Sequence, residues 1–243
     1  MKNQMTDYIQ TNAHYWQSAY NAPYPESFIF RLDGRVLKKY KLYDQEKKDN
    51  FKILDFGCGQ GSHIKYFKDS GFDSYGVDIS EHSIEIAKKK FGNESNKIKL
   101  ISPEAKEDDD YFNVKFDLII SSQVLYYISA SQLEKRIKSF KNMLKPGGHI
   151  FVTMMTTKSW YYTWIIDKNL KTEDGMHVVE HTDNIYNERV KKNINKHFIN
   201  FTQDKKDLIS KFHLFKPIEI GEYDLTYNEN ESEHHYMFFG KLK

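Results

Sequence analysis

The chain has 243 residues, of which 29% are charged and 39% are apolar, and its formal net charge is +2. This length suits one large α/β domain or one domain with a modest cap. The small net charge supplies no bulk field that would draw the protein to nucleic acid or to anionic lipid. The single cysteine, Cys58, excludes an internal disulfide and fits a reducing compartment. No apolar run approaches the roughly 18 residues that span a bilayer, and residues 1–10 lack the apolar core of a signal peptide, so we expect a cytoplasmic protein without membrane insertion.

Residues 1–45 show helical spacing of apolar side chains over residues 6–20 and again over residues 26–43. We expect an N-terminal helical cap over residues 1–45, although a helical pair that simply covers a sheet edge fits the same pattern. Arg31 lies on the second helix, where it could face a carboxylate or a phosphate group.

The most informative stretch is residues 51–63, FKILDFGCGQGSH. Its apolar first half predicts a short buried strand that ends just after Asp55. Gly57, Gly59 and Gly61 then predict a tight turn that opens a helix. A ligand can approach bare backbone amides and the positive end of a helix in such a turn, so the stretch indicates a nucleotide-type site at the mouth of an α/β sheet.

A second strand, over residues 72–78, ends on Asp78. A carboxylate in this place can accept hydrogen bonds from both hydroxyls of a ribose. The turn runs G-x-G-x-G, whereas dinucleotide-binding turns run G-x-G-x-x-G, which disfavours a nicotinamide-dependent dehydrogenase. Residues 55–61 together with Asp78 resemble the first two motifs of the class I S-adenosylmethionine-dependent methyltransferases.

This resemblance implies S-adenosyl-L-methionine as the cofactor and S-adenosyl-L-homocysteine as the product. It implies that Asp78 holds the ribose and that Ile79 packs against the adenine. The backbone of residues 57–61 would pass beneath the methionine portion, and Asp55 would orient the turn or bind the amino group. The family usually places an acid or an amide near the adenine amino group; the usual Asp is missing here, and Glu104 is the nearest candidate.

An apolar run over residues 116–121 predicts another buried parallel strand, whose carboxyl end must face the ligand crevice. Ser121, Ser122 and Gln123 are therefore expected where cofactor and substrate meet, with Tyr127 just beyond. The stretch resembles the fourth motif of the family. It lacks the Asn/Asp-Pro-Pro-Tyr signature of enzymes that methylate DNA adenine or protein amides and the Pro-Cys pair of cytosine C5 enzymes, so we expect no nucleic-acid partner.

The remaining elements follow in the order of the family. We expect a helix over 131–144, a strand over 149–155, a helix over 201–212 and a hairpin of 217–227 with 233–242. Together they predict an α/β fold: a doubly wound, mostly parallel seven-stranded sheet of the Rossmann-like methyltransferase type with a terminal antiparallel hairpin. Residues 46–243 would form the cofactor-binding domain, with a lid insertion at about 156–200.

A hydroxyl acceptor would need a general base. The candidates from sequence are His14, His177, Glu180 and His181. His177 and His181 fit an ordinary surface pair as well, and because no third ligand accompanies them we expect no metal. An acceptor oxygen that is already anionic would instead need a positive group. The side chains expected to shape the substrate pocket are Tyr15, Tyr24, Arg31 and Tyr127.

The segments 14–16 and 25–31 are similar to methyltransferases of bacterial capsule or lipopolysaccharide modification. That similarity implies O-methylation of a small polar acceptor, such as a sugar hydroxyl or a phosphate or phosphoramidate oxygen of a surface-glycan precursor. N-methylation of a small metabolite is the alternative, and a protein that binds the cofactor without catalysis stays open. The sequence predicts a small-molecule partner and leaves the oligomeric state undetermined.

Overall fold

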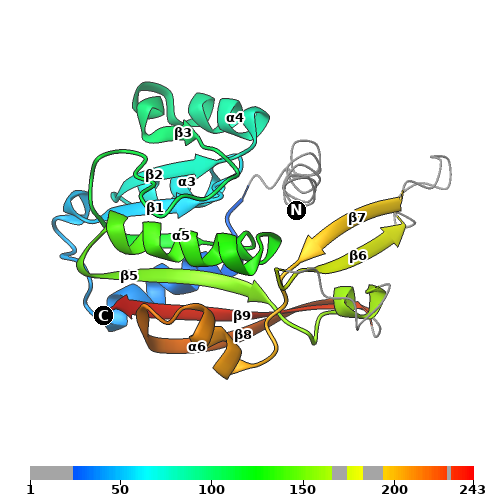
Figure 1. The fold of residues 1–243 in the computed structure, drawn as a ribbon. Coiled ribbons are helices and arrows are strands. Elements are labelled where there is room, and N and C mark those ends of the chain that lie inside the picture. The colour runs from blue at the N-terminus through cyan, green and yellow to red at the C-terminus, as the bar shows by residue number, and fades with distance from the viewer. Residues whose placement is uncertain (1–23, 166–173, 183–193, 229–230) are drawn as a thin grey trace.

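The computed structural model describes residues 24–165, 174–182, 194–228 and 231–243 (Figure 1). Its central sheet has seven strands in the order β3-β2-β1-β4-β5-β9-β8. Their bounds are β1 Lys52–Phe56, β2 Asp73–Asp78, β3 Ile98–Leu100, β4 Phe116–Ser121, β5 Leu144–Met155, β8 Phe215–Asn228 and β9 Glu231–Leu242. The first five strands in this order are parallel, and β9 runs antiparallel to both β5 and β8. The predicted doubly wound sheet with a terminal hairpin is confirmed.

The strands that follow β1 in sequence lie on both sides of it in the sheet, and the order of the strands reverses between β1 and β4. From β1 the chain adds β2 and β3 on one side, and it then returns to add β4 and β5 on the other side. The connections that leave β1 and β4 therefore diverge at the carboxyl ends of these two strands. A crevice at this switch point is the usual ligand site of an open α/β sheet.

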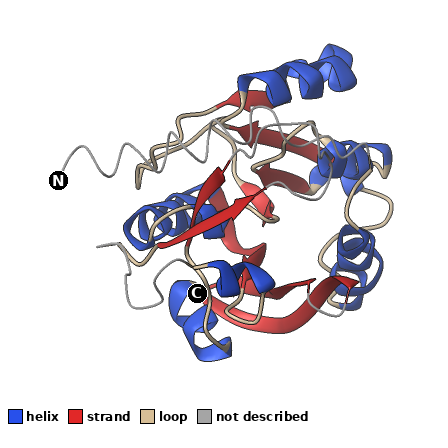
Figure 2. Ribbon diagram, turned by 90° about the vertical axis from the view of Figure 1, so that its right-hand side faces the viewer, coloured by secondary structure: helices blue, strands red, loops and turns tan. Residues whose placement is uncertain are grey.

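Helices cover both faces of the sheet (Figure 2). The adjacent residues Ile53 and Leu54 of β1 belong to two different core clusters, because successive side chains of a strand point to opposite faces. One cluster contains residues of α5 (Ala130–Met143) and α6 (Lys205–Lys211), and the other contains residues of α2 (Ser27–Arg31), η1 (Leu32–Leu37) and α3 (Ser62–Asp69). The helix α4 (Glu81–Phe91) packs beside β2 and β3. The shorter helical turns are η2 Lys48–Asn50, η3 Gly92–Lys97, η4 Leu125–Tyr127 and η5 Trp160–Trp164.

The helix expected over residues 26–43 forms as α2 followed by the π-helical turn η1. Asp33 of this turn is buried and accepts hydrogen bonds from the hydroxyls of Tyr43, at 2.9 Å, and Tyr66, at 3.0 Å. Phe28 and Leu32 share a core cluster with strands of the sheet, so this segment is built into the same core. The helix expected over residues 6–20 lies outside the described residues.

Three elements differ from their predictions. The segment expected to form a lid insertion contains a two-stranded antiparallel sheet, β6 (His177–Thr182) with β7 (Ile194–Ile199), which projects from the central sheet in Figure 1. β5 begins at Leu144 rather than at residue 149, because Leu144 already pairs with Phe116. α6 is shorter than expected, since Asp204 caps its start by accepting a hydrogen bond from the Asp207 amide at 2.8 Å. Within the described ranges, no helix has the length and apolar character needed to cross a membrane.

Candidate active site

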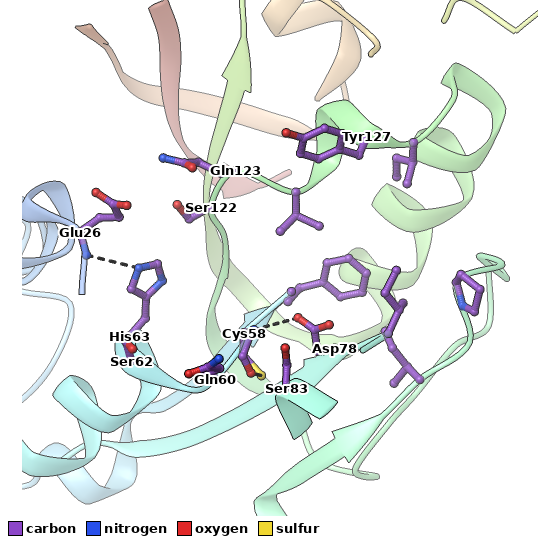
Figure 3. Close-up of a pocket in the computed structure, with 18 of the residues that line it drawn as sticks. Glu26, Cys58, Gln60, Ser62, His63, Asp78, Ser83, Ser122, Gln123 and Tyr127 are labelled. Atoms are coloured by element: carbon purple, nitrogen blue, oxygen red, sulfur yellow. Dashed lines mark hydrogen bonds between the residues drawn. The ribbon is translucent and has the colours of Figure 1, made fainter. Parts of the chain in front are cut away.

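A cavity lies at the carboxyl ends of β1, β2 and β4 (Figure 3). This is the switch point of the sheet, where a ligand is expected. Eight residues expected at the site from sequence line it: Tyr24, Gly57, Gly59, Asp78, Ile79, Ser122, Gln123 and Tyr127. The motifs that follow the strands therefore converge on one site.

The glycine turn borders the cavity with bare backbone. Gly57 has φ +81, and a Cβ atom there would lie 2.3 Å from Val124 Cγ2, so both the conformation and the space require glycine. Gly59 has φ +50, and a Cβ atom there would meet nothing within 4 Å. The absence of a side chain at Gly59 keeps the space above the turn free for a ligand.

Asp78 is held in place by two backbone amides. Its Oδ2 accepts from the Gly59 amide and its Oδ1 from the Ser80 amide, each at 2.8 Å. Each carboxylate oxygen can accept a further hydrogen bond, which suits the two hydroxyls of a ribose. Burial raises the pKa of Asp78 above its usual 3.8, and the nearby charge of Asp55 adds to this shift while the two amides oppose it.

Asp55, near the end of β1, is 1% exposed and, unlike Asp78, is not among the residues that line the cavity. Neither of its carboxylate oxygens accepts a hydrogen bond from any described residue, and Nδ1 of His63 lies 3.5 Å from its Oδ2. A buried carboxylate without hydrogen bonds is costly, so the position suits a cationic group of a ligand, bound directly or through a water molecule. The amino group of S-adenosylmethionine is such a cation, and the donor set of the site fits this cofactor.

Two residues at the cavity were missed by the sequence reasoning. His63 lines the cavity from the first turn of α3, and Glu26 lines it from the residue before α2. The Glu26 amide approaches His63 Nε2 at 3.5 Å, and Figure 3 shows both side chains at the end of the cavity away from Asp78. His63 could have been found, since a helix that starts at Ser62 places its first residues beside the glycine turn.

The adenine end of the cavity departs from expectation at Glu104. Its side chain is exposed and does not line the cavity, whereas Pro103 and Ala105 on either side do. The Ala105 amide donates to Gln132 Oε1 at 2.7 Å, which fixes the turn in this orientation. The wall at this end is therefore apolar rather than acidic.

Two further residues expected at the cofactor have structural positions instead. Ser121 is fully buried and donates through Oγ to the Phe56 carbonyl at 3.1 Å, which ties β4 to β1, and its neighbour Ser122 lines the cavity. Gly61 precedes α3, packs toward Ala87, and is not among the lining residues.

The cavity is also lined by a cysteine and an arginine, and the surroundings of each define its role. Cys58 is buried, and this burial raises the pKa of its thiol well above the usual value, so it is unsuited to act as a nucleophile. Arg136 donates to Asp109 at 2.8 Å, and its guanidinium lies 4.6 Å from the centre of the Phe56 ring.

The candidate bases and the remaining substrate residues are dispersed. His177 is 5% exposed, packs edge-on against Tyr162 and Phe201, and is not among the residues that line the cavity. Arg31 lines a different cavity, between α2–η1 and the hairpin β8–β9. The remaining expected site residues whose side chains lie outside the described part are His14, Tyr15, Glu180 and His181. In the part of the chain that the structure describes, no three His, Cys, Asp or Glu side chains are grouped as metal ligands would be.

Known proteins resemble this chain in both sequence and fold. A family model described as a methyltransferase domain matches residues 29–189. The ubiquinone biosynthesis O-methyltransferase of Pelagibacter ubique is 30% identical over 138 residues, 54% of either chain. The phosphoethanolamine N-methyltransferase of Plasmodium falciparum is 28% identical over 140 residues, which is 55% of this chain and 50% of that one. The chain thus spans about half the length of these curated relatives.

Among solved structures, a S-adenosylmethionine-dependent methyltransferase from Methanosarcina mazei superposes with a TM-score of 0.63 at 16% identity. The superposition covers 84% of this chain and 96% of that one, and it shows the shared fold. The family match alone takes in well over half of the chain. This chain therefore belongs to the methyltransferase domain family, and its fold is that of the class I S-adenosylmethionine-dependent methyltransferases.

Proposed function

We propose that this enzyme transfers a methyl group to a hydroxyl oxygen of a small polar molecule. The observation that carries the proposal is the hydrogen-bonding wall made by Ser122, Gln123 and Tyr127, which line the cavity beyond the glycine turn. A hydroxyl both donates and accepts a hydrogen bond, as do the side chains of this wall.

Gln123 is held rigidly in this wall. Its backbone adopts φ +57, and its amide donates to Thr153 Oγ1 at 2.7 Å. Its side-chain Nε2 donates to the hydroxyl of Tyr223 at 3.3 Å. A side chain fixed in this way positions an acceptor at low entropic cost. The bound cofactor supplies a methyl group on a good leaving group, so the chain needs mainly to align the acceptor oxygen and exclude water.

Glu26 is the proposed proton acceptor. Its carboxylate lines the cavity at the end that His63 also borders, where a hydroxyl proton can be transferred to it. His14, Glu180 and His181 stay further candidates by sequence, whereas the buried position of His177 favours a structural part for that residue.

The charges around the cavity favour a neutral acceptor over a phosphate oxygen. Arg136 is already paired with Asp109, and Arg31 lines the other cavity. We therefore propose a sugar hydroxyl, such as that of a surface-glycan precursor, ahead of a phosphate or phosphoramidate oxygen. We also propose that the enzyme works in the cytoplasm, because its single cysteine fits a reducing compartment.

N-methylation of a small amine is the second candidate. It is supported by the Glu26 carboxylate, which would attract an ammonium group, and by the aromatic rings of Tyr24 and Tyr127 beside it. The resemblance to a phosphoethanolamine N-methyltransferase supports the same alternative.

The proposal is tested by label transfer from methyl-labelled S-adenosylmethionine to acceptor sets that carry only hydroxyl, only amine or only phosphate groups. We expect O-methyl products, and we expect Glu26→Gln to lower kcat while the affinity for the cofactor stays unchanged. Glu46→Gln, at an exposed position remote from the cavity lining, is the matched control. Label on nitrogen alone would favour the second candidate, and transfer to no acceptor would support a protein that binds the cofactor without catalysis.

A further inference from the structure

The covalent order of the cofactor decides which part of it reaches His63. Asp78, where the ribose is expected, lies beside Ile79 and the apolar wall that includes Ala105. His63 and Glu26 lie at the opposite end of the cavity (Figure 3). In the cofactor the ribose is joined to the adenine on one side and, through the sulfonium, to the amino-acid portion on the other. With the adenine against the apolar wall and the ribose at Asp78, the amino-acid portion points toward His63.

That portion carries an ammonium and a carboxylate, and both need partners. Asp55, buried without a hydrogen bond from the described residues, suits the ammonium. A carboxylate needs donors, and it gains most from a cationic one. Of the described residues that line the cavity, two have side chains that can be cationic: Arg136, which Asp109 already engages, and His63.

We propose that His63 binds the α-carboxylate of S-adenosylmethionine and so positions the amino-acid end of the cofactor. His63 Nδ1 lies 3.5 Å from Asp55 Oδ2, and His63 Nε2 lies 3.5 Å from the Glu26 amide nitrogen. Both distances exceed the usual 3.0 Å or so of such hydrogen bonds, so neither contact fully engages the ring. In the imidazolium form both ring nitrogens donate: Nδ1 to Asp55, and Nε2 to the cofactor carboxylate.

The Glu26 amide would supply a second donor to the same carboxylate. It approaches Nε2 at 3.5 Å, so a carboxylate placed against both groups would replace one long contact with two shorter ones. Glu26 also lines the cavity where the acceptor is proposed to bind. Anchoring the carboxylate here therefore places the amino-acid end of the cofactor beside the residue proposed to take up the acceptor proton. This assignment concerns the cofactor and holds for either acceptor class.

The test compares calorimetric affinities for four ligands. S-adenosylmethionine and S-adenosylhomocysteine carry both charged groups, decarboxylated S-adenosylmethionine keeps only the amine, and methylthioadenosine has neither. We expect His63→Ala to weaken binding of the first two by about tenfold or more, and to leave the last two within about twofold. Asp55→Asn should instead weaken the binding of all three ligands that carry an amine. His82→Gln, at an exposed position on α4, is the matched control.

Methylthioadenosine also reports whether a variant keeps the cavity intact, because its binding needs neither His63 nor Asp55. His63→Gln, which keeps one neutral donor, should fall between the wild type and His63→Ala. Equal losses for all four ligands, or an equal loss for S-adenosylmethionine and its decarboxylated form, would overturn the assignment. An unchanged affinity for S-adenosylmethionine in His63→Ala would overturn it as well. No acceptor is present in these titrations, so a failure of the proposed O-methylation would leave their result untouched.

Discussion

The backbone amide of Gly59 donates a hydrogen bond to Asp78 Oδ2 at 2.8 Å and so joins the two halves of the cofactor site. Gly59 belongs to the turn after β1, and Asp78 is the last residue of β2. The amides of Gly57 and Cys58 strengthen the link by donating to the Val77 carbonyl at 2.8 and 3.0 Å. The Asp78 carboxylate, which we expect to bind the ribose, is therefore oriented before any ligand arrives, which lowers the cost of ordering it on binding.

Asp78→Ala should weaken binding of S-adenosylmethionine and S-adenosylhomocysteine by more than tenfold. The variant loses charge-assisted hydrogen bonds to the ribose worth about 1.5–3 kcal/mol, and it frees the Gly59 amide. Calorimetric titration measures the change. Asp69→Ala is the control, because Asp69 is 57% exposed and forms an ion pair with Lys65 one helical turn away. An affinity that matches the wild type would remove Asp78 from the ribose site.

Changing Gly57 or Gly59 to alanine should have different effects, mainly on stability for Gly57 and mainly on cofactor binding for Gly59. Gly57→Ala places a Cβ atom 2.3 Å from Val124 Cγ2 at φ +81, so we expect the free energy of unfolding to fall by about 2–4 kcal/mol. Gly59→Ala has open space and bears only the cost of its positive φ, about 1–2 kcal/mol, but its methyl group intrudes on the ligand.

Thermal unfolding and cofactor titration together separate the two glycine effects. Gly59→Ala should lose more affinity than stability, and Gly57→Ala the reverse. Adding Val124→Ala to Gly57→Ala should recover part of the lost stability, since it removes the atoms that clash. Equal stability of the two single variants would show that the turn relaxes around Gly57.

The central sheet could be predicted because each strand carries its own local signal. Apolar runs mark β1 and β4, and the glycine turn and the capping residue Ser80 mark where the neighbouring helices begin, and these signals do not depend on distant partners. The pair β6–β7 was missed because its strands depend on each other: His177 pairs with Ile199, 22 residues further along the chain. Such a pairing is fixed by tertiary contacts rather than by local pattern.

The lining of the cavity could be predicted where a motif lies at the end of a strand, as at Gly59 and Asp78. It was not predictable where the orientation of one side chain decides the outcome. Ser121 and Ser122 are adjacent, and the alternation of a strand turns the first toward the Phe56 carbonyl and the second toward the cavity. Glu26 reaches the cavity only because α2 packs on the sheet, which is a long-range contact that sequence spacing does not reveal.

Ser121→Ala should lower stability without affecting the cofactor. The variant leaves the buried Phe56 carbonyl without the Oγ hydrogen bond, at a cost of about 1 kcal/mol. Denaturant unfolding should detect this loss, while the affinity for S-adenosylhomocysteine stays unchanged. Ser102→Ala, in an exposed turn, is the matched control. A loss of affinity at unchanged stability would instead place the Ser121 hydroxyl at the ligand.

His177→Ala should also act on stability rather than on chemistry. The ring is 5% exposed and lies edge-on to Tyr162 and Phe201, so its removal should cost about 1–3 kcal/mol in lost packing. Well below the melting temperature, we expect kcat to stay within about twofold of the wild type. His213→Ala, whose ring is 48% exposed, is the control. A large fall in kcat with an intact fold would restore His177 as the general base.

The affinity for methylthioadenosine should fall on acidification, and the fall should begin at a higher pH than for a site with an ordinary aspartate. Burial raises the pKa of Asp78 above 3.8, so its carboxylate takes up a proton at a higher pH than an ordinary aspartate, and the protonated group can no longer accept from both ribose hydroxyls. This ligand carries neither amine nor carboxylate, so the titration does not report on Asp55 or His63. In Asp78→Asn the affinity should be lower and independent of pH over the same range.

The same pKa shift has the opposite sign for folding. Because the folded-state pKa of Asp78 lies above the unfolded-state value, ionisation of this carboxyl costs stability near neutral pH, and that cost disappears as the pH falls through the folded-state pKa. Acid should therefore weaken ligand binding, and it should stabilise the ligand-free protein by removing the buried charge of Asp78. Comparing the free energies of unfolding of the wild type and Asp78→Asn across this pH range isolates the contribution of Asp78. A wild type that loses stability relative to Asp78→Asn on acidification would contradict the raised pKa and, with it, the burial that defines the ribose site.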